Sequence, residues 1–102
     1  MREITEANFQ EFIQDQPAVI TFSSPWCASC KKIARSLEGL SLEFDARVLF
    51  GICDISAHPS IAATLQVFSV PSVLIFQKGA VVKRFQGVVS DAAILQTLKE
   101  CL

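Results

Sequence analysis

Two apolar segments separated by one amphipathic segment constrain the fold of this chain more than any other feature. Residues 18–23 (Ala-Val-Ile-Thr-Phe-Ser) and 47–53 (Arg-Val-Leu-Phe-Gly-Ile-Cys) are near-continuous apolar runs, typical of strands that are buried on both faces of a sheet. Between them, residues 28–43 repeat apolar side chains every three or four positions, which indicates a helix. A strand–helix–strand unit is parallel and right-handed, so the sequence predicts an α/β fold with residues 18–23 as a central strand.

The rest of the chain continues this alternation without a linker or repeat. Three further helices are expected, at residues 6–14 with Thr5 as N-cap, at residues 59–65, and after Ser90. Three further strands are expected, at residues 2–4, 72–77 and 81–86. The last two strands flank a short glycine-containing turn, which predicts an antiparallel hairpin in a mixed sheet. Residues 1–102 therefore form a single domain in the order (β)αβαβαββα.

Composition excludes several classes of protein. Hydrophobic residues make up 51% of the chain and charged residues 19%, which favours a folded core over disorder. A net charge of −1 offers no broad positive field for nucleic acid. No apolar run approaches the roughly 20 residues that a membrane-spanning helix needs, and the first residues lack the pattern of a secretory signal. We expect a monomer in the cytoplasm with neither a nucleic-acid nor a membrane partner.

The strongest chemical signal is residues 26–30 (Trp-Cys-Ala-Ser-Cys), which lie between the central strand and the long helix. A thiolate at Cys27 is stabilised there, because first-turn N–H groups have no partners within a helix and the helix dipole adds positive charge. One helical turn brings Cys30 back toward Cys27, close enough for a disulfide. The pair can therefore store two electrons, with Cys27 attacking a foreign disulfide and Cys30 resolving the mixed disulfide.

A Cys-x-x-Cys pair is also half of many zinc sites, so a structural zinc site is the alternative for this motif. Further ligands could come only from Cys53, Cys101 and His58, and these form no second closely spaced pair. Cys53 and Cys101 are better interpreted as small apolar residues of a buried strand and of a helix face. His58 precedes a proline at an expected helix start, which suits a surface or capping role. We expect no bound metal and no organic cofactor.

The sequence resembles the thioredoxin family over essentially its whole length. The Trp-Cys-x-x-Cys motif at residues 26–30 is similar to the family's active site, and Val70-Pro71 occupies the place of its cis-proline. Gly79 and Gly87 fall at the hairpin and before the last helix, as in the family. The resemblance implies a four- or five-stranded mixed sheet with helices on both faces, and reversible dithiol–disulfide exchange on protein substrates.

The resemblance also implies roles for individual residues. Cys27 would be the attacking thiol and Cys30 the resolving thiol. Val70 and Pro71 would pair with an extended substrate segment, and Trp26 would belong to the same contact surface, unless it simply covers the core. Electrons would come from a separate disulfide reductase. The alternative is a binding or adaptor module that keeps the cysteine pair but turns over little.

Two departures from the family pattern affect how the pair is tuned. Ala28 and Ser29 replace the usual Gly-Pro between the cysteines, which restores a backbone donor near Cys27 and alters the balance between thiolate and disulfide. Thr21 occupies the position at which many thioredoxins carry a buried aspartate. A hydroxyl is a poor base at neutral pH, so we expect Cys30 to deprotonate less readily than in those proteins.

Overall fold

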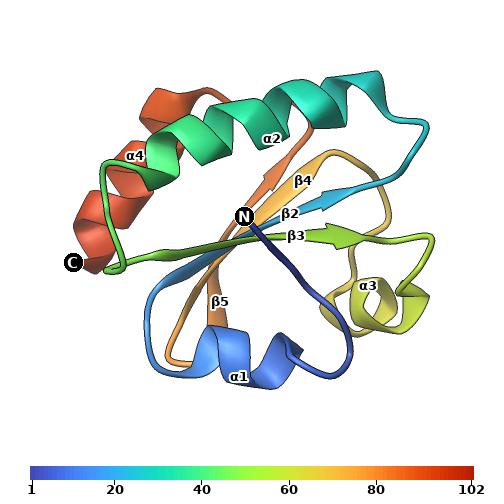
Figure 1. Cartoon of the computed structure of the whole chain (residues 1–102), viewed down its shortest axis with the longest axis horizontal. Coiled ribbons are helices and arrows are strands. Elements are labelled where there is room, and N and C mark those ends of the chain that lie inside the picture. The colour runs from blue at the N-terminus through green and yellow to red at the C-terminus, as the bar shows by residue number, and fades with distance from the viewer.

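A five-stranded mixed sheet in the order β1-β3-β2-β4-β5 forms the centre of the molecule, as seen in a computed structural model that describes residues 1–102 (Figure 1). The strands are β1 (Arg2–Glu3), β2 (Ala18–Ser23), β3 (Leu49–Asp54), β4 (Ser72–Gln77) and β5 (Ala80–Gln86). The helices are α1 (Phe9–Gln14), α2 (Ala28–Ser41), α3 (Pro59–Leu65) and α4 (Asp91–Cys101). This architecture confirms the predicted fold class and order of elements.

Strand β2 is the middle strand of the sheet, as its apolar sequence predicts. It pairs in parallel with β3, with Ala18 opposite Leu49, and antiparallel with β4, with Phe22 opposite Ser72. Neighbours on both edges and helices over both faces leave its first five residues buried. An alternating pattern would have left one face polar, so the continuous apolar run is what this position requires.

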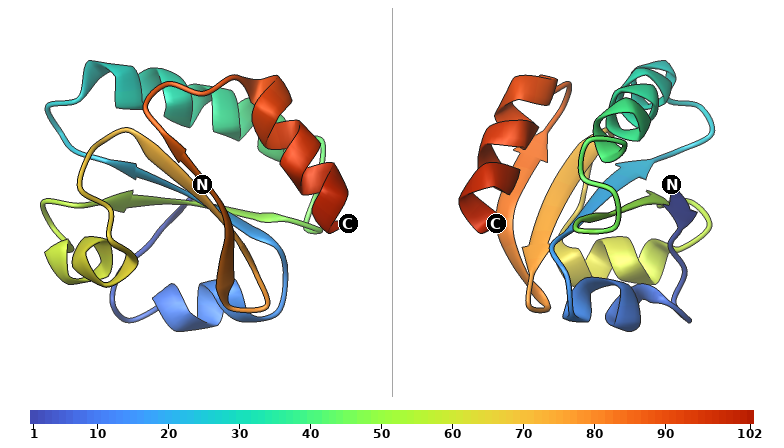
Figure 2. Two further views of the ribbon diagram at one scale, coloured as in Figure 1. Left: turned by 180° about the vertical axis from the view of Figure 1, so that it is seen from behind. Right: turned by 60° about the vertical axis from the view of Figure 1, so that its left-hand side comes forward.

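The helices cover the sheet in two layers, with α2 and α4 on one face and α1 and α3 on the other (Figures 1 and 2). Each layer closes its own core. One cluster joins α1 and α3 to the sheet through side chains such as Phe12, Ile61 and Phe22. The other joins α2 and α4 to the opposite face through side chains such as Leu37 and Leu98. The apolar stripes of the helices therefore account for the three-layer arrangement.

The first helix begins later than predicted, at Phe9 rather than at residue 6. Thr5 does not cap this helix. Its Oγ1 accepts from Ala7 N at 3.2 Å and so closes a separate turn, while Asn8 is the N-cap residue. The Asn8 side chain is engaged elsewhere, because its Oδ1 accepts from Thr5 N at 2.8 Å and its Nδ2 donates to Glu3 O. Local side-chain bonds thus compete with the first turn of the helix.

Other boundaries differ by one or two residues. The long helix ends at Ser41 instead of residue 43, and β3 begins at Leu49 instead of residue 47. The predicted cap of α4 is confirmed, because Ser90 Oγ accepts from Ala93 N at 3.2 Å. The hairpin is also confirmed: β4 and β5 are antiparallel, and Gly79 has the positive φ of 83° that its turn requires.

Candidate active site

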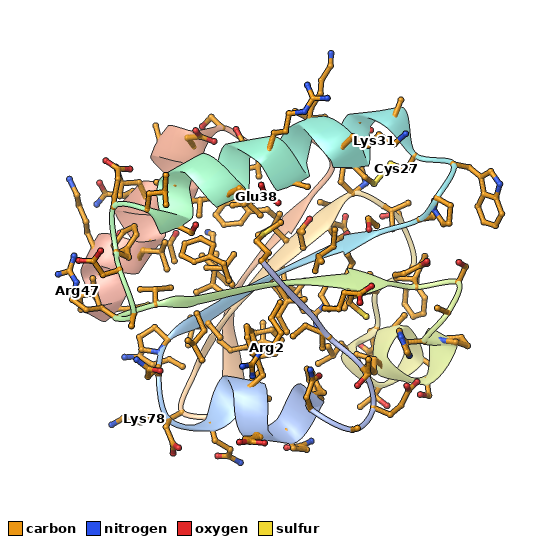
Figure 3. All side chains as sticks on the ribbon, viewed as in Figure 1. Arg2, Cys27, Lys31, Glu38, Arg47 and Lys78 are labelled. Carbon is orange, nitrogen blue, oxygen red and sulfur yellow. A yellow bond between two sulfur atoms is a disulfide. The ribbon has the colours of Figure 1, made fainter.

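Cys27 and Cys30 lie at the junction of β2 and α2, where they form a disulfide (Figure 3). Strand β2 ends at Ser23, and Cys27 N donates to Ser24 O at 3.2 Å, which holds the turn into the helix. Cys27 is the N-cap residue of α2, in an extended conformation, and Cys30 lies in the first helical turn. The Cα atoms of the two cysteines are 5.3 Å apart, as one turn of helix predicts.

The two sulfur atoms differ in their access to other molecules. Cys27 is half-buried, whereas Cys30 is 2% exposed and faces the interior of the protein. Exchange requires a thiolate to approach a sulfur of the partner disulfide directly. Cys27 is therefore the more exposed of the two cysteines.

Two hydrogen-bonding groups lie at the Cys27 sulfur. Its Sγ accepts from Cys30 N at 3.2 Å and lies 3.5 Å from Ser29 Oγ. Such donors, together with the helix dipole, favour the charged form of this sulfur once the disulfide is reduced. The backbone donor that the absence of proline restores is Ser29 N–H, whereas the groups found at this sulfur are Cys30 N–H and the Ser29 hydroxyl. Ala28 is exposed and contributes no polar side chain.

Val70 and Pro71 lie at the same end of the sheet as the disulfide. The peptide bond between them is cis. Because Phe22 is opposite Ser72, the segment that leaves β2 toward Cys27 and the segment that enters β4 after Pro71 are neighbours. Pro71 is buried and Val70 half-buried, and Pro71 O accepts from Gly87 N at 2.8 Å. The structure thus brings together the residues that the sequence assigned to the site.

Trp26 projects into solvent, with 82% of its surface exposed. It does not cover the core, so of its two predicted roles the contact surface is the one that its position supports. Phe68, which the sequence reasoning missed, is 83% exposed in the loop before Val70. An aromatic residue three positions before the proline was the available signal.

Thr21 lies on β2 within the sheet and is fully buried. Its Oγ1 is the buried side-chain polar atom that has no hydrogen-bond partner. A hydroxyl in this state donates and accepts nothing in the oxidised protein. The role of Thr21 toward the cysteine pair stays a prediction.

Cys53 and Cys101 are free cysteines and take no part in the disulfide. Cys53 is fully buried in the cluster beneath α1 and α3, and this burial raises the pKa of its thiol to about 11. Cys101 packs against the other cluster, and burial again raises its pKa. Neither thiol is a good nucleophile near neutral pH, because a raised pKa lowers the fraction of thiolate. No group of three or more His, Cys, Asp or Glu side chains is arranged to hold a metal ion.

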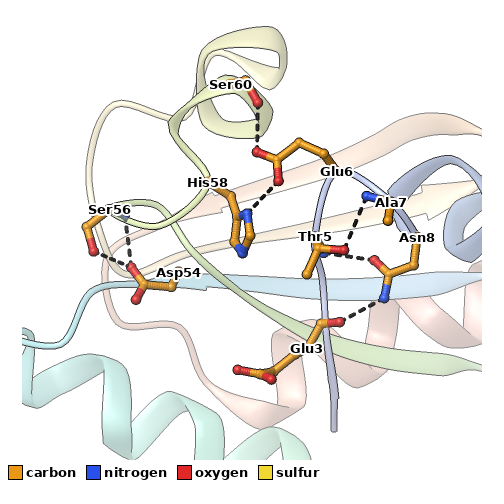
Figure 4. A network of polar contacts seen from close by, with 9 residues as sticks. All are labelled: Glu3, Thr5, Glu6, Ala7, Asn8, Asp54, Ser56, His58 and Ser60. Atoms are coloured by element: carbon orange, nitrogen blue, oxygen red, sulfur yellow. Dashed lines mark hydrogen bonds and ion pairs between the residues drawn. The ribbon is translucent and has the colours of Figure 1, made fainter.

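His58 belongs to a polar network between the N-terminal segment and the start of α3 (Figure 4). Its Nδ1 lies 2.6 Å from Glu6 Oε1, and Ser60 Oγ donates to Glu6 Oε2 at 2.9 Å. A main-chain hydrogen bond and these two side chains lower the pKa of Glu6. Nearby, hydrogen bonds from Ser56 lower the pKa of Asp54. His58 therefore joins two segments of chain, and it contributes no capping bond to α3.

No helix of this chain combines the length and the apolar character that a membrane-spanning segment needs. The longest, α2, spans 14 residues and is amphipathic, with basic side chains such as Lys31 exposed beside the disulfide (Figure 3).

Comparison with known proteins places this geometry in a family. The sequence model described as Thioredoxin matches residues 1–100. The thioredoxin of Staphylococcus haemolyticus is 34% identical over 85 residues, covering 83% of this chain and 82% of that protein. The thioredoxin of Mycobacterium tuberculosis is 30% identical over 100 residues, covering 96% and 86%. A bifunctional thioredoxin reductase/thioredoxin of Mycobacterium leprae is 32% identical over 100 residues, and the match covers 96% of this chain but 22% of that longer protein.

Proposed function

The chain belongs to the thioredoxin family and is a thiol–disulfide oxidoreductase, and we propose that Cys27 is its attacking thiol and Cys30 its resolving thiol. The observation that carries this assignment is the difference in access between the two sulfurs of one disulfide at the start of α2. Cys27 is the sulfur that a partner can reach, and its surroundings favour a thiolate. Cys30 is shielded, as suits a thiol that reacts only within the protein.

The proposed reaction proceeds in two exchanges. In the reduced protein, the Cys27 thiolate attacks one sulfur of a substrate disulfide, which forms a mixed disulfide and releases the other substrate sulfur as a thiolate that takes up a proton. Cys30 then loses its proton and attacks the Cys27 sulfur, which restores the Cys27–Cys30 disulfide and releases the second substrate thiol. Two electrons pass from the protein to the substrate, which ends as two thiols.

We assign the binding of substrate to Trp26, Val70 and Pro71. Val70 N–H has no acceptor within the chain, and the loop that carries it lies beside the segment leading to Cys27. An extended substrate segment can pair with this backbone as a short added strand. The exposed Trp26 ring lies directly before the reactive cysteine and supplies apolar contact area.

In this proposal three residues affect the reactivity of the cysteine pair. Ser29 places its hydroxyl near Cys27, Ala28 leaves the first turn without proline, and Thr21 provides no carboxylate to accept the Cys30 proton. We expect formation of the mixed disulfide to be fast and its resolution by Cys30 to be slower than in thioredoxins that carry an aspartate at this position.

The substrates are disulfides in other proteins, and a separate thioredoxin reductase is the proposed source of electrons. The bifunctional relative, whose name joins a thioredoxin reductase to a thioredoxin, supports that pairing of activities. The monomeric state and the cytoplasmic location stay predictions.

Reduction of insulin disulfides with dithiothreitol tests the assignment. We expect the wild type to accelerate precipitation of the insulin chains, and Cys27→Ser to lose this activity. Cys30→Ser should accumulate a mixed disulfide with insulin through Cys27, visible on a non-reducing gel. Full activity of Cys27→Ser would contradict the assigned roles. Tight partner binding that depends on neither cysteine, without turnover, would support an adaptor instead.

A further inference from the structure

Three large apolar side chains are exposed at the end of the sheet that carries the disulfide. Trp26, Phe68 and Val88 are 82%, 83% and 73% exposed, and we call these three residues the apolar rim. They belong to three different loops, which precede α2, precede β4 and follow β5. Single exposed apolar side chains are ordinary on a protein surface, but a group of them beside a reactive centre indicates a contact surface.

The three loops are held together by backbone contacts. Pairing of Phe22 with Ser72 sets the loop before α2 beside the loop before β4. The bond from Gly87 N to Pro71 O, 2.8 Å long, sets the loop after β5 beside the same segment. Figure 1 shows all three loops at one end of the sheet. The three loops that carry the apolar rim therefore lie at the end of the sheet that carries the redox site.

The Phe68 loop also has unused backbone donors. The N–H groups of Phe68, Ser69 and Val70 donate no hydrogen bond within the chain, although Ser69 O accepts from the Ser72 hydroxyl at 2.8 Å. Free donors in a row suit pairing with an extended polypeptide better than contact with a compact small molecule. A segment paired with this loop runs past the Phe68 ring.

We propose that Phe68 is a specificity-determining residue, which selects substrate disulfides whose cysteine lies in an extended segment next to large apolar side chains. This inference rests on the proposed function and names its substrate class. An apolar side chain near the target cysteine covers the Phe68 ring and so removes apolar area of both partners from water. A segment with polar flanks leaves the ring exposed and gains no such contribution.

Two matched peptide disulfides test the proposal. One peptide is Gly-Leu-Cys-Leu-Gly and the other is Gly-Ser-Cys-Ser-Gly, each oxidised to its symmetric disulfide. The reduced protein reacts with each peptide, and chromatography after acid quench gives the second-order rate constant for release of the peptide thiol. The measured quantity is the ratio of the two rate constants, which cancels changes in the reactivity of Cys27 itself.

We expect the wild type to prefer the leucine peptide by about tenfold, which corresponds to about 1.4 kcal/mol. Phe68→Ser should lower this ratio at least about threefold, and Phe68→Leu should retain most of it, because leucine still offers apolar area. Leu42→Ser serves as the matched control. Leu42 is similarly exposed, at 79%, but it caps the far end of α2, about 21 Å from the disulfide at 1.5 Å per residue.

The outcomes separate this inference from the proposed function. A ratio that Phe68→Ser leaves unchanged, while the wild type still reduces both peptides, overturns the specificity role and leaves the oxidoreductase assignment intact. An equal drop in the ratio of rate constants for Phe68→Ser and Leu42→Ser also overturns it, since both residues would then act through nonspecific apolar contact. A wild type that reduces neither peptide contradicts the proposed function, and the inference falls with it.

Discussion

Removal of the buried Thr21 hydroxyl should stabilise the protein, whereas removal of the buried Ser72 hydroxyl should destabilise it. Thr21 is fully buried with Oγ1 unpaired, whereas Ser72 is 3% exposed and its Oγ donates to Ser69 O at 2.8 Å. A buried polar group without a partner costs about 1–3 kcal/mol. Thr21→Val replaces the hydroxyl with a methyl of similar volume, so it should raise the free energy of unfolding by about 1–2 kcal/mol. Ser72→Ala removes a satisfied bond and should lower it by about 1 kcal/mol.

Urea unfolding of the oxidised proteins, followed by circular dichroism, measures both changes. With a denaturant dependence of about 1–2 kcal/mol/M, Thr21→Val should move the midpoint up by about 1 M and leave the slope unchanged. In thermal melts, 1 kcal/mol corresponds to about 4–8 °C for a domain of this size. A lower midpoint for Thr21→Val would contradict this expectation, because it would show that the hydroxyl is hydrogen-bonded in solution.

Four further substitutions have defined outcomes. Thr21→Asp should speed insulin reduction near pH 7 several-fold, because a carboxylate can accept the proton of the resolving thiol. Glu6 has a lowered pKa in the folded protein, so its contribution to stability is complete above about pH 5 and is lost as the pH falls through that pKa. In Glu6→Gln, the urea midpoint should therefore fall less between pH 6 and pH 3 than it does in the wild type. Gly51→Ala places a Cβ 2.8 Å from the Ile4 side chain and should lower the free energy of unfolding by about 1–3 kcal/mol. The Cβ of Gly39→Ala on α2 meets nothing within 4 Å, so this substitution should raise the free energy of unfolding by about 0.5–1 kcal/mol.

Each of these outcomes has a clear opposite. An unchanged or lower reduction rate for folded Thr21→Asp counts against the tuning role of this position. Equal pH dependence of wild type and Glu6→Gln means that the hydrogen bonds to this carboxylate do not hold in solution. Equal stability of Gly51→Ala and Gly39→Ala would contradict the close packing of β3 against the N-terminal segment.

Sequence periodicity predicted the core of the fold well, because burial on two faces leaves a strong signal. The bounds of β2, α3 and β4 match the predicted ranges, since each is closed by local features such as Pro17, Pro59 and the cis-proline loop. The predicted start of α1 was wrong because Thr5 and Asn8 form a turn of their own. Such local competition depends on geometry that periodicity does not describe.

The site was predicted to a similar extent. The cysteine pair follows from spacing and from its place at a helix start, and the structure brings Val70 and Pro71 to the same end of the sheet. The exposure of Phe68 could not be predicted, because an aromatic residue in a loop can cover the core or face solvent according to tertiary contacts alone. The unpaired state of the Thr21 hydroxyl is likewise a property of the packed interior.

Cys27 and Cys30 should cycle between a dithiol and a disulfide, and thiol trapping in glutathione buffers follows this cycle. The protein is equilibrated at a series of potentials, quenched, alkylated and analysed by peptide mass spectrometry. We expect the peptide that carries both cysteines to gain two alkyl groups together under reducing conditions and none under oxidising conditions, with one two-electron midpoint. A pair that stays alkylated at every potential, or that yields singly alkylated peptide with Cys27 bound to glutathione and unresolved, would contradict it.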